Sequence, residues 1–215
     1  MKRFLSILLV VLAICGVCAV GTSAAAAKKG FNPDAIKKCF FLNDTTGITG
    51  YGHCGVVLVD ENNYARLYNF QRDGLSRRGL TPAQLEQFLK DGLPFPTSQF
   101  QFNRVIIFNI TPEEGRRMYD QAETHQFQDF NRETSFWVSI FPVEGDNCLT
   151  VARSITTAGS PKYDFLYPFG LPNSTFYTMQ MSLFFHGVPY TLAYPEKPPE
   201  AEAPAVEAAA PAAAQ

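Results

Sequence analysis

The chain has 215 residues, and its 18 lysines and arginines nearly balance its 20 aspartates and glutamates. This balance gives no basic patch and excludes the positively charged surface on which nucleic-acid binding depends. Hydrophobic residues make up 46% of the chain and aromatic residues 13%, which is enough for a full hydrophobic core in one domain.

The first 26 residues have the pattern of a secretory signal peptide. Lys2 and Arg3 give a positive start, residues 4–20 are apolar, and residues 22–27 are the small residues typical of a cleavage site. We therefore expect an exported protein, located in a periplasm or cell envelope, with no membrane span after cleavage. The alternative is that the apolar segment is retained as a membrane anchor.

The other end of the chain, residues 195–215, consists almost entirely of proline, alanine and glutamate. Such a segment cannot bury enough apolar surface to offset the conformational entropy that it would lose on folding. We predict a disordered or extended tail, which leaves residues 28–194 for the folded domain.

Within the domain, the apolar patterning predicts an α+β fold. Strands are expected at residues 38–42, 52–60, 64–71, 105–108 and 135–141. Two helices are expected after Thr81 and Thr111, because a proline follows each threonine and a polar side chain three positions on completes a capping box. The first helix is expected to end at Gly92 and the second near His125.

Three further segments complete the expected order of elements. Residues 71–79 are polar and predict a loop, and residues 163–171 are rich in aromatic side chains and proline and predict a surface. Residues 178–194 predict two final strands around His186.

The strands at 52–60 and 64–71 are separated by a polar turn and predict an antiparallel hairpin. His53 starts the first strand, and Cys54 faces the opposite side of the sheet because successive side chains alternate. Asn69 on the returning strand is expected roughly opposite His53, to within a residue or two.

Cys148 is expected in the first turn of a helix over residues 149–158. Asp146 or Asn147 is a suitable N-cap, and Gly159 a suitable end. The positive end of the helix dipole lowers the pKa of a thiol at this position.

After signal cleavage the chain has an odd number of cysteines, Cys39, Cys54 and Cys148. Either Cys39 and Cys54 form a disulfide and Cys148 is the remaining thiol, or all three are reduced and mostly buried.

A cysteine nucleophile needs a lowered pKa, a nearby base and a group that orients the base. Cys148 as nucleophile, His53 as base and Asn69 as orienting group would meet these needs. The structural alternatives are an ordinary strand-end histidine, an inert buried cysteine and a surface amide. The three histidines lack the spacing of metal ligands, and no phosphate-binding or dinucleotide motif is present, so we expect no cofactor.

The sequence Gly-His-Cys-Gly-Val-Val-Leu-Val-Asp at 52–60 resembles the histidine strand of the NlpC-type papain-like amidase superfamily. The sequence Asp-Asn-Cys-Leu-Thr-Val-Ala-Arg at 146–153 resembles the cysteine helix of its circularly permuted branch, in which histidine precedes cysteine. This branch includes lecithin retinol acyltransferase-like enzymes and exported bacterial families. Many relatives have a second histidine on the returning strand, where the most suitable polar residue of this chain is Asn69.

The resemblance implies a permuted papain-like fold, an antiparallel sheet packed against helices with the Cys148 helix at the active site. It also implies acyl-enzyme chemistry on an amide, such as a peptide of the cell wall, with a thioester or lipid ester as the second substrate class. His186 follows Cys148, as in the unpermuted order, and is the alternative base, although Pro189 makes its surroundings a poor central strand. The competing function is a non-catalytic envelope module for binding or assembly.

Overall fold

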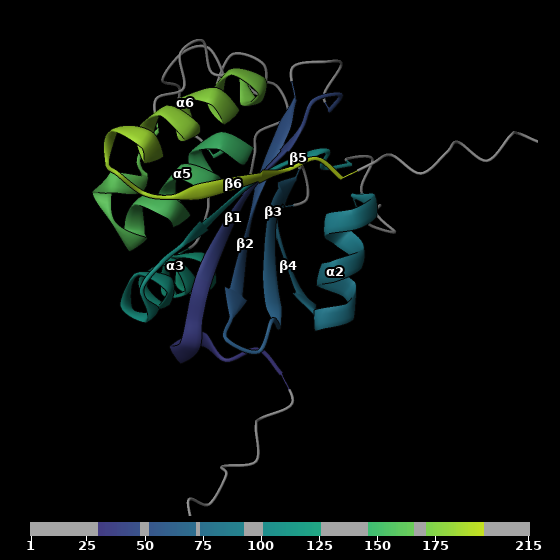
Figure 1. The fold of residues 1–215 in the computed structure, drawn as a ribbon, viewed down its shortest axis with the longest axis vertical. Helices are drawn as coiled ribbons and strands as arrows, with labels where there is room; N and C mark the ends of the chain where they lie inside the picture. Colours follow the sequence, from purple (N-terminus) through teal and green to yellow (C-terminus); the bar gives the residue numbers. More distant parts are fainter. Residues whose placement is uncertain are drawn as a thin grey trace, which may run out of the picture.

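A computed structural model describes residues 30–47, 52–71, 74–92, 101–125, 146–165 and 171–195 of the chain (Figure 1). The predicted signal peptide, the predicted strand at 135–141 and the tail from residue 196 onward lie outside these residues. Among the helices that the structure describes, none has the length and apolar character needed to cross a lipid bilayer.

The domain is built on a six-stranded antiparallel sheet with the strand order β4-β3-β2-β1-β5-β6. The strands are β1 (Ile36–Asp44), β2 (His53–Asp60), β3 (Ala65–Gln71), β4 (Gly74–Leu80), β5 (Arg104–Asn109) and β6 (Tyr190–Ala193). The helices are α2 (Pro82–Asp91), α3 (Pro112–Thr124), α5 (Cys148–Gly159) and α6 (Pro172–Phe185), with short 3-10 turns η1 (Pro33–Ala35) and η2 (Pro161–Tyr163). The predicted α+β class is therefore confirmed.

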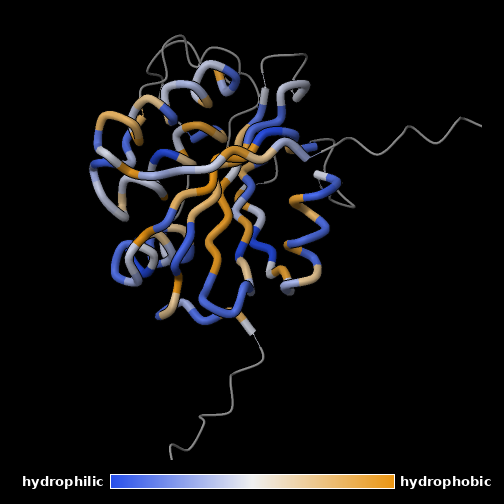
Figure 2. The backbone as a smooth tube through the Cα atoms, in the orientation of Figure 1, coloured by the Kyte–Doolittle hydropathy of each residue, from blue (hydrophilic) through white to orange (hydrophobic). Residues whose placement is uncertain are grey.

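Helices cover both faces of the sheet, with α2 on one face and α3, α5 and α6 on the other (Figure 1). The strands in the middle of the sheet are apolar along most of their length because both of their faces are buried (Figure 2). On β2, Val57 and Val59 belong to the cluster under α2, whereas Cys54, Val56 and Leu58 belong to the cluster under the other three helices. This is the alternation expected from the sequence.

The two helix starts predicted from capping boxes are present. The hydroxyl of Thr81 accepts a hydrogen bond from the amide of Gln84, and that of Thr111 accepts one from the amide of Glu114. In return, the side chains of Gln84 and Glu114 accept hydrogen bonds from the backbone amides of the two threonines. Gly92 ends α2 in the left-handed conformation with φ 62°, which glycine adopts without steric cost.

The loop predicted at residues 71–79 is wrong for most of its length, because Gly74–Leu80 forms the edge strand β4. The strand pairs with β3 through backbone hydrogen bonds, which do not require an apolar pattern on an exposed edge. On this edge strand, the Arg77 guanidinium lies 3.6 Å from a carboxylate oxygen of Glu123 on α3.

Of the two strands predicted within residues 178–194, the one before His186 is wrong, whereas the one after it is present. Residues up to Phe185 belong to α6, and only Tyr190–Ala193 forms a strand. The helix begins at Pro172, its N-cap residue Leu171 provides no side-chain hydrogen bond, and apolar residues lie around most of its circumference. It therefore offers neither a capping signal nor the periodicity from which a helix is predicted.

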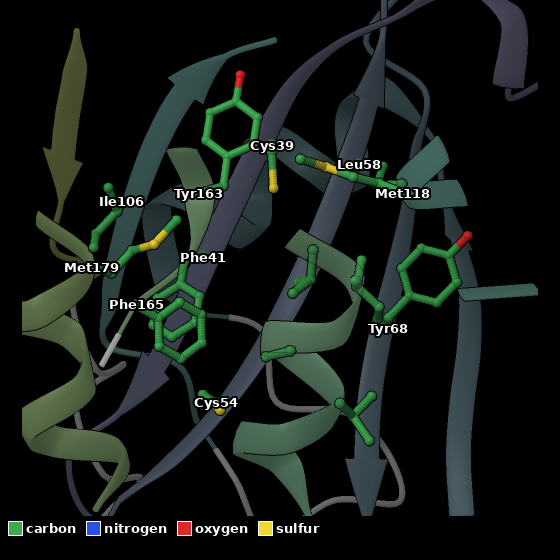
Figure 3. Close-up of a cluster of buried hydrophobic side chains, with 14 of the residues drawn as sticks. Cys39, Phe41, Cys54, Leu58, Tyr68, Ile106, Met118, Tyr163, Phe165 and Met179 are labelled. Atoms are coloured by element: carbon green, nitrogen blue, oxygen red, sulfur yellow. The ribbon is translucent and has the colours of Figure 1, made fainter. Parts of the chain in front are cut away.

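The surface predicted at residues 163–171 is wrong at its beginning. Tyr163 and Phe165 are 0% and 1% exposed and belong to the main core, where Phe165 packs edge-on against Phe41 with ring centres 5.2 Å apart (Figure 3). The Tyr163 hydroxyl donates a 2.7 Å hydrogen bond to the carboxylate of Glu114. The aromatic composition of this segment thus serves the core, and residues 166–170 lie outside the described ranges.

Helix α3 lies close to β1 at Gly115. A Cβ atom on this glycine would lie 2.6 Å from Cβ of Ile36 and 3.2 Å from its backbone oxygen. Gly115→Ala gains about 1 kcal/mol in helix propensity, but overpacking against backbone costs about 1–3 kcal/mol. We expect a net decrease in the free energy of unfolding, measured as a lower urea midpoint.

The matched control is Gly79→Ala, since nothing lies within 4 Å of a Cβ atom at this exposed position of β4. Its free energy of unfolding should stay within about 0.5 kcal/mol of the wild-type value. A midpoint for Gly115→Ala at or above that of the wild type would contradict the close contact between α3 and Ile36.

Candidate active site

The candidate site begins at the first residue of β2. His53 is 2% exposed and lies opposite Asp44 of β1 in the strand register. Its Nε2 atom lies 2.6 Å from Oδ1 of Asn69 on β3. Because a carboxamide oxygen only accepts hydrogen bonds, Nε2 carries the hydrogen, and Nδ1 is the ring nitrogen that can take a proton.

The bond between His53 and Asn69 is diagonal across the two strands. Val57 pairs with Leu67, and continuing this register places Asn69 opposite Gly55, two positions from His53. A shift of two residues keeps a side chain on the same face of the sheet. The offset lies within the range expected from the sequence, and the two side chains meet.

Gly55 contributes to this geometry by having no side chain. A Cβ atom here would lie 3.2 Å from Cζ of Phe102, which packs over the strand at this point. The Phe102 ring in turn stacks against the imidazole of His53 with ring centres 5.8 Å apart. Phe102 therefore restricts the orientation of His53, a role that no motif in the sequence indicates.

The second part of the site is the start of α5, where Cys148 is the first helical residue. Asn147 is the N-cap, and its side-chain oxygen accepts hydrogen bonds from the amides of Leu149 at 2.8 Å and Thr150 at 3.0 Å. The side chain of Cys148 lies close enough to the side chains of Cys54 and His53 for both to lower its pKa. The structure thus brings together Cys148, His53 and Asn69, the three residues singled out in the sequence.

The electrostatics of the site favour a charged thiolate. A hydrogen bond from Cys54 is the largest influence that lowers the pKa of Cys148, and burial opposes it. The charge and the hydrogen bond of His53 lower the pKa further, and the net result is a pKa well below the usual value for a thiol. The helix dipole acts in the same direction because Cys148 lies at the positive end of α5.

His53 shows the complementary effect. Burial lowers its pKa, but the charge and hydrogen bond of Cys148, the hydrogen bond to Asn69 and the charge of Asp44 together outweigh burial and raise it. A thiolate and an imidazolium therefore stabilise each other in this site.

Asp44 was not singled out in the sequence. It is 1% exposed, and its two carboxylate oxygens accept hydrogen bonds from the amide and hydroxyl of Thr46 and the amide of Gln101, each at 2.9 Å. These donors stabilise a buried negative charge on β1, opposite His53 on β2. Only the strand register identifies this neighbour, because the two residues belong to different strands.

The expectation that Cys54 points away from the pair is wrong. Its side chain belongs to the core cluster on the α5 face (Figure 3), and its sulfur donates a hydrogen bond to the backbone oxygen of Cys148 at 3.1 Å. Burial and the neighbouring Cys148 raise the pKa of Cys54 well above the usual value. All three cysteines of the described domain are free and buried, which contradicts a disulfide between Cys39 and Cys54.

The other two histidines lie at helix ends. His125 is the exposed C-cap of α3. His186 is the exposed C-cap of α6, and its Nδ1 lies 2.8 Å from the backbone oxygen of Ser182. The histidine whose charge lowers the pKa of Cys148 is His53, so the structure does not favour His186 as the base.

The site holds a thiol at a helix N-terminus, an imidazole in contact with it and an amide oxygen that orients the imidazole. These are the groups required for nucleophilic attack on a carbonyl carbon. In the part of the chain that the structure describes, no three histidine, cysteine or acidic side chains are grouped to hold a metal ion. No family model, no curated protein and no solved structure matches this chain, so its own geometry carries the case for its function.

Proposed function

We propose that the protein is an exported cysteine hydrolase with a permuted papain-like fold, in which Cys148 is the nucleophile, His53 the acid and base, and Asn69 the orienting residue. The observation that carries the proposal is the chain of contacts from Cys148 to His53 and from His53 to Asn69. A buried cysteine that served only packing would not need a buried imidazole beside it. It would also not need an amide oxygen bonded to the other nitrogen of that imidazole. The order of histidine before cysteine along the chain supports the permuted arrangement.

In the proposed reaction, the thiolate of Cys148 attacks the carbonyl carbon of an amide. The S–C bond forms, and the carbonyl π electrons move to oxygen. The tetrahedral intermediate collapses with cleavage of the C–N bond, and the proton on Nδ1 of His53 passes to the departing amine. A water molecule then gives its proton to His53 and hydrolyses the thioester, which restores the thiolate and the imidazolium.

The start of α5 also supplies a place for the developing oxyanion. The backbone amide of Cys148 is one of the first amides of the helix, which have no acceptor within the helix itself. The side chain of Asn147 accepts hydrogen bonds from the amides of Leu149 and Thr150, and not from the amide of Cys148. A donor fixed in this way needs no reorganisation when the charge forms.

The substrate class follows from the resemblance and from the predicted export. A peptide amide of the bacterial cell wall is the proposed substrate, and a thioester or lipid ester is the second class. Purified cell-wall peptides incubated with the wild type should lose an amide bond that Cys148→Ala leaves intact. Mass spectrometry of the products identifies the bond.

The nucleophile can be tested without a known substrate. At pH 6 we expect iodoacetamide to label Cys148 and not Cys39 or Cys54, because Cys148 has a lowered pKa and is 9% exposed whereas the other two are 0% exposed with raised pKa values. Labelling should decline as the pH falls through the lowered pKa of Cys148, since protonation removes the thiolate. Residue-specific mass spectrometry measures the labelling rate.

The matched variants are Cys148→Ala, which should abolish labelling at pH 6, and Cys39→Ala, which should leave it unchanged. Circular dichroism of each variant checks that the fold is intact. Equal labelling of the wild type and Cys148→Ala would disprove the assignment of the nucleophile.

One observation favours the non-catalytic binding module as the second candidate. The outer side of α6 carries four exposed apolar residues at helical spacing, Tyr177, Met181, Phe184 and Phe185. Exposed apolar patches of this kind mark binding surfaces in other proteins. An unreactive Cys148 together with binding to cell-wall preparations that is lost in Phe184→Ser would favour this candidate over the hydrolase.

A further inference from the structure

The outer side of α6 is an apolar surface that the fold leaves exposed. Tyr177, Met181, Phe184 and Phe185 stand at positions i, i+4, i+7 and i+8, which lie on one side of an α-helix. We call these four side chains the outer stripe; they are 54% to 74% exposed. The hydrophobic character of the C-terminal half of α6 is visible in Figure 2. Such a stripe is the kind of helix face that packs against another helix.

The outer stripe lies in a part of the chain that has no charged residues. No aspartate, glutamate, lysine or arginine occurs between Asp164 and Glu196, a stretch that includes all of α6. A helix that lies on a membrane surface usually carries lysine and arginine beside its apolar face, and these attract anionic lipids. The lack of such residues favours a protein partner over a lipid surface.

A helix face without charges is suited to contact with a copy of itself. When two identical surfaces meet about a twofold axis, a residue near the axis faces its own copy, so a charge there would face a like charge. Met181 lies in the middle of the outer stripe. Its flexible apolar side chain can pack against itself without such repulsion.

The charged side chain of Arg104 contacts the outer stripe at its N-terminal end. The guanidinium lies 5.8 Å from the centre of the Tyr177 ring, and Nη1 donates a 3.3 Å hydrogen bond to the Tyr177 hydroxyl. In an antiparallel pair of α6 helices, this end would meet the C-terminal end of the other helix, where the helix dipole is negative and favours a cation. The position of Arg104 therefore fits an antiparallel pair.

The area of the outer stripe is also sufficient for a dimer. A fully exposed side chain of this size has about 200 Å² of accessible surface, so the four exposed fractions amount to about 500 Å² per copy. Two copies would together bury about 1,000 Å², which is the lower limit for a specific interface and is typical of a weak one.

We propose that the protein forms a twofold-symmetric homodimer through α6, in which the outer stripes of two copies pack antiparallel with Met181 at the axis. This proposal does not depend on the hydrolase function, because it uses no residue of the candidate active site. It assigns a second copy of this chain to the surface on which the alternative binding function depends.

The test is an exchange of charge at Met181 in the full-length mature protein. Sedimentation velocity over a range of concentrations measures the mass of the wild type, Met181→Glu and Met181→Lys. We expect the wild type to approach twice the mass of one chain, with a Kd of about 1–100 µM for an interface of this size. Each variant alone should be monomeric, with a Kd raised at least about 100-fold, because like charges then face each other across the axis.

An equimolar mixture of Met181→Glu and Met181→Lys should recover the mass of the dimer, since a glutamate then faces a lysine. A lipid surface or an unrelated protein as the occupant predicts no recovery. Recovery in the mixture therefore identifies the second copy as the partner.

Gln87→Glu is the matched control, because Gln87 is an exposed residue of α2, the helix on the opposite face of the sheet (Figure 1). Its mass should follow that of the wild type. A wild type that stays monomeric overturns the proposal, and so does a dimer that persists in Met181→Glu. A mixture that stays monomeric overturns it as well. Binding of the wild type to anionic phospholipid vesicles or cell-wall preparations, lost in Met181→Glu, would then assign the outer stripe to that partner.

Circular dichroism checks the fold of each variant. If a charged variant at position 181 does not fold, Phe184→Ser replaces it, since Phe184 is 72% exposed and its loss removes apolar contact area without adding a charge. Loss of the dimer in Phe184→Ser then supports the proposal, and a dimer of unchanged Kd overturns it.

Discussion

His53→Gln is expected to lower kcat/KM for the proposed amide substrate by about 10³-fold. Removing a general acid and base typically costs about 10²–10⁴-fold. The variant also loses the cation that stabilises the thiolate, because the charge and hydrogen bond of His53 both lower the pKa of Cys148. Glutamine fills much of the space of the imidazole beside Phe102 and can still bond to Asn69, so the fold should be retained.

The variant should also change the pH dependence of the thiol. In the wild type, the ion pair exists above the lowered pKa of Cys148 and below the raised pKa of His53. Alkylation of Cys148 should therefore proceed well below pH 8.5 in the wild type. In His53→Gln it should move upward toward the ordinary thiol value of about 8.5 or beyond, because burial raises a thiol pKa when no cation is present.

His186→Gln is the matched control, because His186 is exposed at the end of α6 and bonds only locally to the backbone oxygen of Ser182. Its kcat/KM and its alkylation profile should equal those of the wild type. If His53→Gln retained alkylation at low pH, the thiolate would not depend on His53, and the proposed pair would be wrong.

The sequence predicted the parts of the site that depend on local chemistry. A capping side chain before Cys148 and prolines after Thr81 and Thr111 act within one helical turn, and the structure has all three helix starts. The hairpin of β2 and β3 was also predicted from the sequence, since a polar turn separates two apolar strands. These signals are local because the groups that satisfy each other are neighbours in the chain.

The parts that the sequence did not predict depend on contacts between distant segments. Cys54 was placed on the correct face of β2, yet α5 covers that face, so the residue expected to point away from Cys148 lies against it. Asp44 became a neighbour of His53 only through the register of β1 with β2. Alternation gives the face of a side chain but not which helix covers that face.

Helix α6 shows a second limit of prediction from the sequence. Its N-terminal turn lies close to the site, because the Asn43 side chain donates to the backbone oxygens of both His53 and Pro172. The sequence favoured strands in this region, since threonine, phenylalanine and tyrosine have high β propensity. Tertiary packing of Phe176, Met179 and Leu183 against the sheet overrides this preference.

Asn69→Leu is expected to lower kcat by about 10²-fold while KM changes little. Leucine has a similar size but offers no acceptor for the hydrogen on Nε2 of His53, which now bonds to Oδ1 of Asn69 at 2.6 Å. Without that acceptor the ring is free to change tautomer or rotate, and a small misplacement of a catalytic group costs about 10²-fold in rate. The effect is smaller than that of His53→Gln because the imidazole is still present.

Asn69→Asp separates orientation from mere packing. Aspartate keeps an acceptor for Nε2 and adds a negative charge, which favours the imidazolium and should raise the pKa of His53 further. We expect kcat within about tenfold of the wild type and an alkaline limb of the pH profile that moves to higher pH. The buried carboxylate should also lower the free energy of unfolding at low pH, where it must be protonated.

Asn109→Leu and Asn109→Asp make the same two changes at an exposed position at the end of β5. Both should leave kcat and the pH profile unchanged. If Asn69→Leu retained the kcat of the wild type, or if leucine and aspartate at position 69 had the same effect, the amide oxygen would not orient His53. The site would then be a cysteine and histidine pair whose imidazole is held in place by Phe102 and Asp44.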